Sequence, residues 1–238
     1  MARVWMPLPD TDFDVTEVAV PWKLLVRAGH EVVFATEHGG RAPACDPLLL
    51  SGVLFGQLGA EAEPKRFYRE LEGSPEFQAP VSWRTIDPSA FDGLVLAGGH
   101  APGMKQYLAS ESLFEKVRAF FALGRPVAAI CHGTIVAARA GVLRDKKTTC
   151  LPAYMERTAY FLTAWKLGRY YRTYPAYVED EVRGACKELV RGPTSLVTRG
   201  TDDDDRAAFV VEDGSYVSAR WPGDAYLFAK RFLAKLPA

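Results

Sequence analysis

The amino-acid sequence predicts an α/β protein with a doubly wound, mostly parallel sheet. Short and nearly continuous apolar runs alternate with segments of helical spacing, which is typical of strands buried between two layers of helices. The first three expected elements are strand, helix and strand, which implies parallel pairing with a right-handed crossover. A later apolar run ends abruptly at Cys131-His132-Gly133 and is followed by a second apolar stretch of helical character. With 238 residues, we expect one domain over residues 1–238.

The individual elements follow from the same patterns. The strands are expected at residues 3–8, 31–36, 91–97, 126–130, 195–198, 208–211 and 216–219. The helices are expected at residues 15–28, 112–123 and 223–236, with a further one after the Cys131 turn. Asp213-Gly214 between the last two strands predicts a hairpin.

Two stretches interrupt the alternation. Residues 41–88 are rich in Pro, Gly and charge, and we expect an insertion over the sheet with one helix at 64–71. Residues 154–186 are helical in pattern and dense in aromatic side chains. Such a density favours core or a subunit interface, and a ligand pocket is the second interpretation.

Composition excludes several classes of function. Lys and Arg number 29 and Asp and Glu number 29, so the formal net charge is zero and we expect neither a nucleic-acid nor a membrane partner. No apolar run approaches the roughly 20 residues that span a bilayer, and the start enters a strand pattern without a signal peptide, so we expect a cytoplasmic protein. The run Asp202-Asp203-Asp204-Asp205 is expected to be a solvated turn.

The four cysteines are far apart and form no CxxC pair. They are Cys45, Cys131, Cys150 and Cys186. This spacing predicts reduced thiols and no metal site.

Cys131 has the position of a nucleophile. A strand that ends there and re-enters a helix places the residue on a sharp elbow, where we expect an exposed sulfur at a helix N-terminus. Such a position lowers a thiol pKa.

Two other loops are expected at the same sheet edge, because ligands bind beyond the C-terminal ends of parallel strands. Gly98-Gly99-His100 follows the third strand, and its bare N–H groups suit an oxyanion hole, although a plain tight turn is the alternative. Asp14 is a candidate helix cap with Glu17 at the third helical position. Glu17 is therefore either a capping residue or a buried, protonated carboxyl that donates a hydrogen bond to the thiol.

These motifs together resemble the ThiJ/PfpI superfamily. The resemblance rests on Ala-Ile-Cys-His-Gly at the elbow, on Gly-Gly-His after the preceding strand, and on Glu17 placed before Pro21 and Gly29. It implies the flavodoxin-like fold of class I glutamine amidotransferases. Its members include the parkinsonism-associated protein deglycase, the PfpI protease and heat-shock glyoxalases.

The resemblance also implies roles for individual residues. The nucleophile falls on Cys131, its acidic partner on Glu17 and its adjacent imidazole on His132. The oxyanion donors would be the Gly99 and His132 N–H groups, and His100 is a second imidazole near the thiol. Where the deglycase branch has a histidine after Thr-Thr, this chain has Cys150, so the protease-like and heat-shock branches fit better. Their acid that orients the histidine is assigned to Glu156, although a neighbouring subunit supplies it in the protease-like branch.

The sequence thus predicts a cysteine-dependent enzyme acting on a small carbonyl compound, either glyoxalase- or deglycase-like or an amide hydrolase. The resemblance further implies a homodimer or larger homo-oligomer, and we expect no metal and no organic cofactor. A redox sensor or holdase using the same cysteine is the alternative from another class. A glutamine amidotransferase is disfavoured because no histidine follows the elbow, and an α/β-hydrolase because Ala129 stands where its elbow needs glycine.

Overall fold

The computed structural model describes residues 1–54, 56–195 and 198–237. A seven-stranded sheet with the order β10-β11-β7-β6-β1-β3-β5 forms its centre. All neighbouring pairs are parallel except β10 and β11, which form an antiparallel hairpin. The doubly wound fold and the hairpin are therefore confirmed, while the strand expected at residues 195–198 includes two residues outside the described ones.

The sheet strands lie close to their predicted positions, except β5, which was not predicted. They are β1 (Arg3–Pro7), β3 (Glu31–Thr36), β5 (Val81–Ser82), β6 (Gly93–Leu96), β7 (Val127–Ile130), β10 (Val210–Asp213) and β11 (Tyr216–Ala219). Most of their apolar side chains are buried, as the continuous apolar runs require, while Val81 of the edge strand β5 is exposed. Two small two-stranded sheets pair β2 (Thr11–Phe13) with β4 (Ala44–Cys45), and β8 (Lys147–Thr148) with β9 (Glu188–Leu189).

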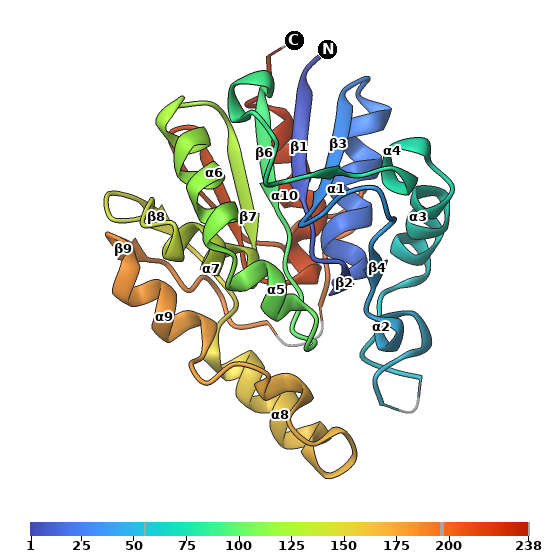
Figure 1. Ribbon diagram of the computed structural model, residues 1–238. Coiled ribbons are helices and arrows are strands. Elements are labelled where there is room, and N and C mark those ends of the chain that lie inside the picture. Colours follow the sequence, from blue (N-terminus) through green and yellow to red (C-terminus); the bar gives the residue numbers. More distant parts are fainter. Residues whose placement is uncertain (55, 196–197, 238) are drawn as a thin grey trace.

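Helices cover both faces of the sheet. In Figure 1, α6 and α7 lie in front of the strands and α10 lies behind them. The helices are α1 (Val15–Arg27), α2 (Pro47–Ser51), α3 (Ala62–Glu72), α4 (Pro75–Gln78), α5 (Met104–Leu108), α6 (Glu111–Ala122), α7 (Gly133–Arg139), α8 (Ala153–Leu167), α9 (Val178–Ala185) and α10 (Ala225–Leu233). Short 3₁₀ turns are η1 (Pro88–Ala90), η2 (Tyr170–Arg172) and η3 (Pro222–Asp224). None of these described helices has the length and apolar character needed to cross a bilayer.

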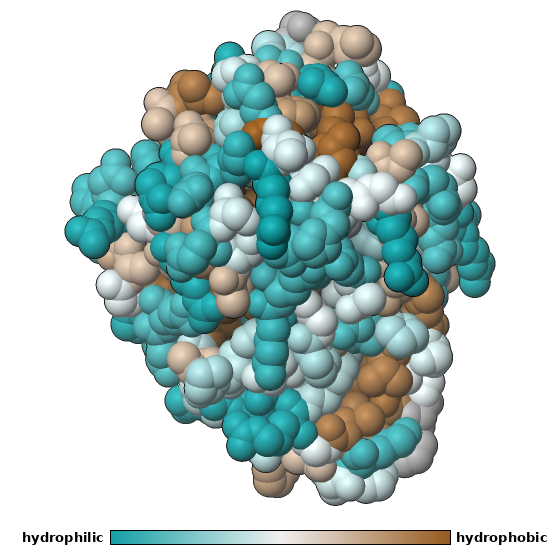
Figure 2. Space-filling view, in the orientation of Figure 1, coloured by the Kyte–Doolittle hydropathy of each residue, from teal (hydrophilic) through white to brown (hydrophobic). Residues whose placement is uncertain are grey.

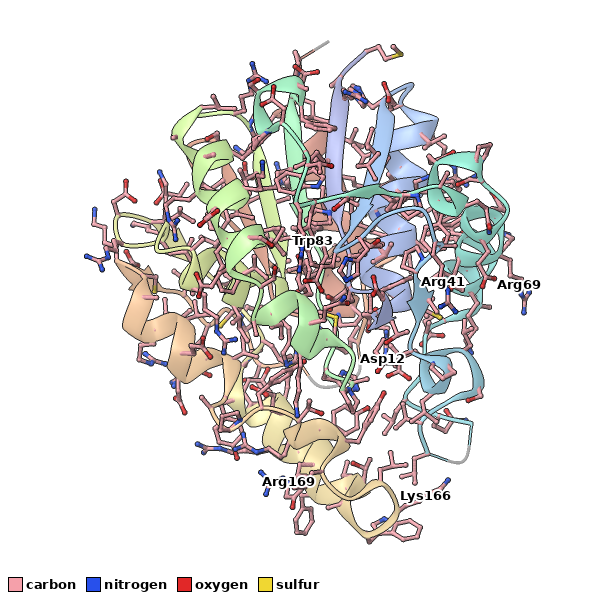
Figure 3. The ribbon with its side chains drawn as sticks, viewed as in Figure 1. Asp12, Arg41, Arg69, Trp83, Lys166 and Arg169 are labelled. Carbon is pink, nitrogen blue, oxygen red and sulfur yellow. The ribbon has the colours of Figure 1, made fainter. Side chains whose placement is uncertain are left out.

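The two expected insertions do more than cover the sheet. Residues 41–88 add an edge strand, because β5 pairs with β3, and α3 packs against α1. The second insertion carries α8, η2 and α9, and α8 extends away from the C-terminal ends of the strands. Its far end is marked by Lys166 in Figure 3. Both insertions therefore flank the edge at which a doubly wound sheet binds ligands.

Candidate active site

The elbow at Cys131 connects β7 to α7 and is held by β11. Cys131 has a φ of 55°, in the left-handed region, and its N–H donates to the Ala219 carbonyl of β11 at 3.1 Å. The Thr134 hydroxyl donates to the Cys131 carbonyl at 2.6 Å, which fixes the first turn of α7. A non-glycine residue held in this conformation costs about 1–3 kcal/mol, and such strain is concentrated at functional sites.

Glycine at position 98 allows the three loops to meet. A Cβ atom there would lie 2.7 Å from both the Glu17 carboxyl and the His132 nitrogen. The Gly98 N–H donates to Glu17 Oε2 at 2.9 Å, and the Gly98 carbonyl accepts from the Asp14 N–H at 2.9 Å. The structure thus brings together the residues that the sequence placed on three separate loops.

Glu17 is more than a capping residue. Asp14 is the N-cap of α1, and its carboxyl accepts from the Thr16 and Glu17 N–H groups at 2.8 and 3.1 Å. The Glu17 side chain does not accept a hydrogen bond from the Asp14 N–H, because this N–H donates to the Gly98 carbonyl. Only half of a capping box therefore forms. The fully buried Glu17 carboxyl instead lies beside the Cys131 thiol.

Burial raises the pKa of Glu17 well above its usual value, and the nearby Asp14 carboxyl adds to the rise. Burial therefore favours the protonated form of Glu17, which is the form that can donate a hydrogen bond. Oε1 has no other partner that meets hydrogen-bond geometry among the described residues, so this oxygen can turn its proton to the sulfur.

The state of the thiol corrects one expectation. Cys131 is only 4% exposed, and burial raises the pKa of its thiol well above the ordinary value. The sequence predicted an exposed sulfur with a lowered pKa, and that was wrong, because the thiol is enclosed beside the Glu17 carboxyl and the His132 ring. The resting thiol is neutral, and deprotonation must accompany the reaction.

His132 is placed to receive that proton. Its Nδ1 lies 3.4 Å from Cys131 Sγ, and its ring packs against Tyr174 with centroids 5.3 Å apart. Burial lowers the pKa of His132 to about 3, so the imidazole is neutral and can accept a proton. The His132 N–H interacts with the Cys131 side chain, while the Gly99 N–H makes no hydrogen bond within the described residues.

His100 lines the same cavity. Its ring stacks on Tyr171 at 4.3 Å, and burial lowers its pKa to about 3. Tyr170 of the same turn donates a hydrogen bond to Asp46, the N-cap of α2. This contact joins the two insertions, and no sequence signal pointed to it.

Glu156 does not orient His132. Its carboxyl accepts from the Val178 N–H at 2.9 Å, at the start of α9, and no hydrogen bond to His132 forms within the described residues. Glu179 of α9 accepts in turn from the Ala153 N–H at 2.8 Å, at the start of α8. The two helices cap each other, since neither has a capping side chain of its own.

The capping role of Glu156 predicts a pH-dependent stability. Burial raises the pKa of Glu156 to about 7, so the folded state binds a proton that the unfolded chain releases near pH 4.5. The wild type should therefore lose up to about 3 kcal/mol relative to Glu156→Gln as pH rises from 4.5 to 8. Urea unfolding of both proteins across this range measures the difference.

Glu156→Gln should also keep kcat near the wild-type value. A tenfold loss of kcat would instead support the role of Glu156 as the acid that orients His132.

The carboxyl at position 17 predicts a shift in thiol titration. Glu17→Gln keeps an acceptor for the Gly98 N–H, so the melting temperature should stay close to that of the wild type. After burial, the Glu17 carboxyl is one of the causes that raise the pKa of the Cys131 thiol, and a neutral amide removes its negative charge, so the midpoint of Cys131 titration should fall. Absorbance of the thiolate at 240 nm, with Cys131→Ser as the blank, measures it. A raised midpoint would show that Glu17 stays protonated while the thiol titrates.

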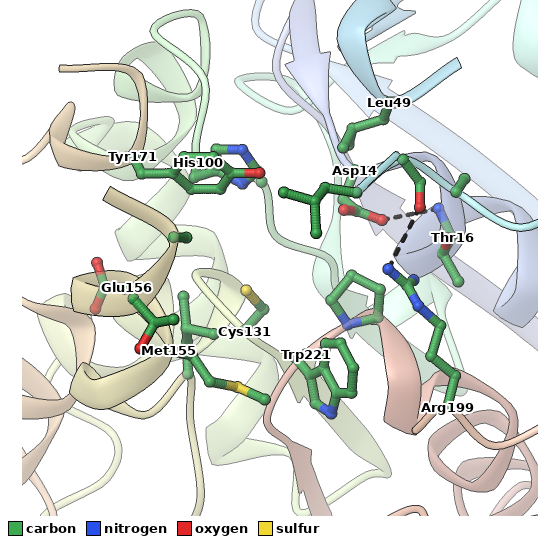
Figure 4. Close-up of a pocket in the computed structure, with 18 of the residues that line it drawn as sticks. Asp14, Thr16, Leu49, His100, Cys131, Met155, Glu156, Tyr171, Arg199 and Trp221 are labelled. Carbon is green, nitrogen blue, oxygen red and sulfur yellow. Dashed lines mark hydrogen bonds between the residues drawn. The ribbon is translucent and has the colours of Figure 1, made fainter. Parts of the chain in front are cut away.

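The site opens into a cavity of about 290 Å³ (Figure 4). Cys131, Gly99 and His100 line it from the sheet edge, while α8 and the α2 segment supply its walls. Clusters of three or more potential metal ligands are absent from residues 1–54, 56–195 and 198–237. In the 202–205 run, Asp202, Asp204 and Asp205 instead pair with basic side chains nearby.

The chain is similar to proteins of one family over nearly its whole length. The sequence model of the family described as ThiJ/PfpI family-like matches residues 8–193. An uncharacterized protein of Schizosaccharomyces pombe is 34% identical over 238 residues, which cover 96% of this chain and 81% of that protein. Deglycase PfpI of Pyrococcus furiosus is 27% identical, with 96% of both chains covered. The structure of glyoxalase III from Candida albicans covers 99% of this chain and 98% of its own, with a TM-score of 0.72 at 18% identity, and shows the shared fold. The chain belongs to the ThiJ/PfpI family.

Proposed function

We propose that this protein is a cysteine-dependent enzyme that converts small 2-oxoaldehydes, without a cofactor. The observation that carries the proposal is the Cys131 sulfur at the floor of a cavity, 3.4 Å from the neutral His132 imidazole and beside the buried Glu17 carboxyl. The relatives named deglycase and glyoxalase III support this class of reaction.

The first step needs only the groups present. The sulfur forms a bond to the aldehyde carbon, the thiol proton moves to His132 Nδ1, and the carbonyl π electrons become an oxyanion. The Gly99 N–H is free to stabilise that charge. Moving hydrogen from the aldehyde carbon to the adjacent carbon, with addition of one water, then gives a 2-hydroxy acid, and no external oxidant or reductant is consumed.

Aldehyde addition fits this site better than amide hydrolysis. Cleavage of an amide requires an imidazolium to protonate the departing amine. Burial lowers the pKa of His132 to about 3, and no carboxylate partner lies beside it among the described residues, so an imidazolium is not held there until an amine departs. Addition to an aldehyde expels no leaving group, so the proton that His132 takes from the thiol can pass directly to the oxyanion and no imidazolium has to persist.

A holdase is the second candidate, because α8 exposes large apolar side chains. Phe161 is 83% and Trp165 69% exposed. Such residues could bind unfolded chains, and this role would need no turnover at Cys131.

A substrate screen separates the candidates. Purified wild type and Cys131→Ser are incubated with glyoxal, methylglyoxal, small amides and peptides, and loss of carbonyl and formation of 2-hydroxy acid are followed. We expect saturable conversion of the aldehydes by the wild type alone. Two results together would favour the holdase. The wild type would convert none of the aldehydes, and both the wild type and Cys131→Ser would suppress the aggregation of an unfolded client protein.

A further inference from the structure

We infer that the natural substrate of the Cys131 site carries a neutral, extended apolar substituent on its carbonyl group. This inference rests on the proposed function and adds the class of substrate. A cavity of about 290 Å³ approaches the size that encloses drug-sized ligands, of about 300 Å³ or more. Methylglyoxal would fill only a small part of it next to the sulfur.

The space beyond the sulfur is lined mainly by apolar side chains. They are Leu49, Leu58, Leu151, Met155, Leu162 and Trp221. Figure 4 shows Met155 and Trp221 among the side chains that line the same cavity as Cys131. Figure 2 shows an apolar area low on this face of the molecule, in the direction of α8 and the α2 segment.

The two insertions supply opposite parts of this wall. Met155 and Leu162 are seven residues apart on α8 and therefore share one helix face. Leu49 and Leu58 come from the α2 segment and the loop after it. Neither insertion supplies the groups proposed for catalysis, which are Cys131, His132, Glu17 and the Gly99 N–H, so the insertions define what lies behind the carbonyl group.

The charges at the cavity do not favour an anionic substituent. Arg199 brings a positive charge to the wall, but its Nε lies 3.7 Å from Glu61 Oε1 and its guanidinium stacks over Trp221 at 5.2 Å. Its charge also acts on the Asp14 carboxyl in the same wall. The positive charge is thus balanced by two carboxyl groups, and a neutral apolar chain is the occupant that loses least on leaving water.

The test is a series of unbranched 2-oxoaldehydes whose alkyl group grows from methyl to pentyl. Each methylene removed from water should raise kcat/KM by about threefold to fivefold until the cavity is full. A flat or falling series would overturn the inference, as would a higher kcat/KM for an analogue that ends in a carboxylate. Failure of the proposed function is a different result, namely no conversion of methylglyoxal or any longer aldehyde.

Two neighbouring residues of α8 provide a matched pair of variants. Leu162→Asp should reduce the ratio of kcat/KM for the pentyl and methyl compounds by about tenfold or more, because a carboxylate then lines the apolar wall. Phe161→Asp changes an exposed side chain outside the lining and should leave the ratio unchanged. Equal ratios in the two variants would contradict the assignment of this wall.

A binding measurement keeps the inference testable without turnover. Cys131→Ser is titrated with 2-pentanone and 2-octanone, and binding is followed by calorimetry. The longer ketone should bind more tightly by the same factor for each methylene, and Leu162→Asp in the same background should remove the difference. Equal affinities for the two ketones would refute the apolar specificity.

Discussion

Replacing Cys131 with serine is expected to reduce aldehyde turnover to background, a loss of about 10⁴-fold or more. Serine has nearly the same size, so the elbow should stay intact. A hydroxyl loses its proton far less readily than a thiol, and the buried site disfavours its anion further. Steady-state rates with methylglyoxal measure the effect. Cys186→Ser removes a half-buried thiol outside the cavity and should leave kcat unchanged.

His132→Ala should lower kcat by about 10²–10⁴-fold, because the raised pKa of Cys131 makes a proton acceptor necessary. Combining this change with Cys131→Ser should add nothing, since the two groups act as one unit. His100→Ala should act mainly on KM, because His100 lines the cavity against Tyr171. A His132→Ala enzyme as fast as the wild type would exclude the proposed base.

The sequence alone could predict that Gly98, Cys131 and Glu17 lie at one edge of the sheet, because this follows from the topology. Gly98 lies two residues after β6, and Cys131 directly follows β7, the parallel neighbour of β6. The C-terminal ends of adjacent parallel strands meet at one edge, so local patterns sufficed to bring the two loops together. Glu17 reached the same edge because α1 begins directly after the loop that follows β1.

The burial of the thiol could not be predicted in this way. It accompanies contacts around the site between segments far apart in the chain, such as the packing of Tyr174 on His132 and the stacking of Tyr171 on His100. Neither contact has a periodicity or a spacing that a single sequence reveals. The aromatic segment was expected mainly in the core or at an interface, yet Tyr171 lines the cavity and Phe161 is exposed.

Glu156 shows why a residue type alone does not determine a role. A carboxyl a few residues past Thr149 fits an orienting acid, and the sequence contains no competing signal. The competing demand is the unsatisfied N–H at the start of α9, which lies 22 residues further along. Capping by a neighbouring helix is a tertiary interaction, so the local sequence of α9 does not predict it.

Replacing Gly133 with alanine is expected to destabilise the protein by about 3 kcal/mol, although alanine is the better helix former. A Cβ atom at this position would lie 2.1 Å from the Leu96 carbonyl oxygen and 2.8 Å from that of Ala97. Both are backbone atoms at the end of β6, in the middle of the sheet, and neither can rotate away. The elbow must therefore move, which also displaces Cys131 from His132 and from the Gly99 N–H.

Thermal unfolding measures the effect, and a chain of this length should lose about 6–12 °C in melting temperature. Gly184→Ala is the matched control, because Gly184 lies within α9 and a Cβ there meets nothing within 4 Å. That variant should gain about 0.5–1 kcal/mol, since alanine restricts the unfolded chain more than glycine. If both variants melted above the wild type, the close approach of α7 to β6 would not be what shapes the elbow. The strain at Cys131 would then have to arise from its hydrogen bonds to β11 and Thr134 alone.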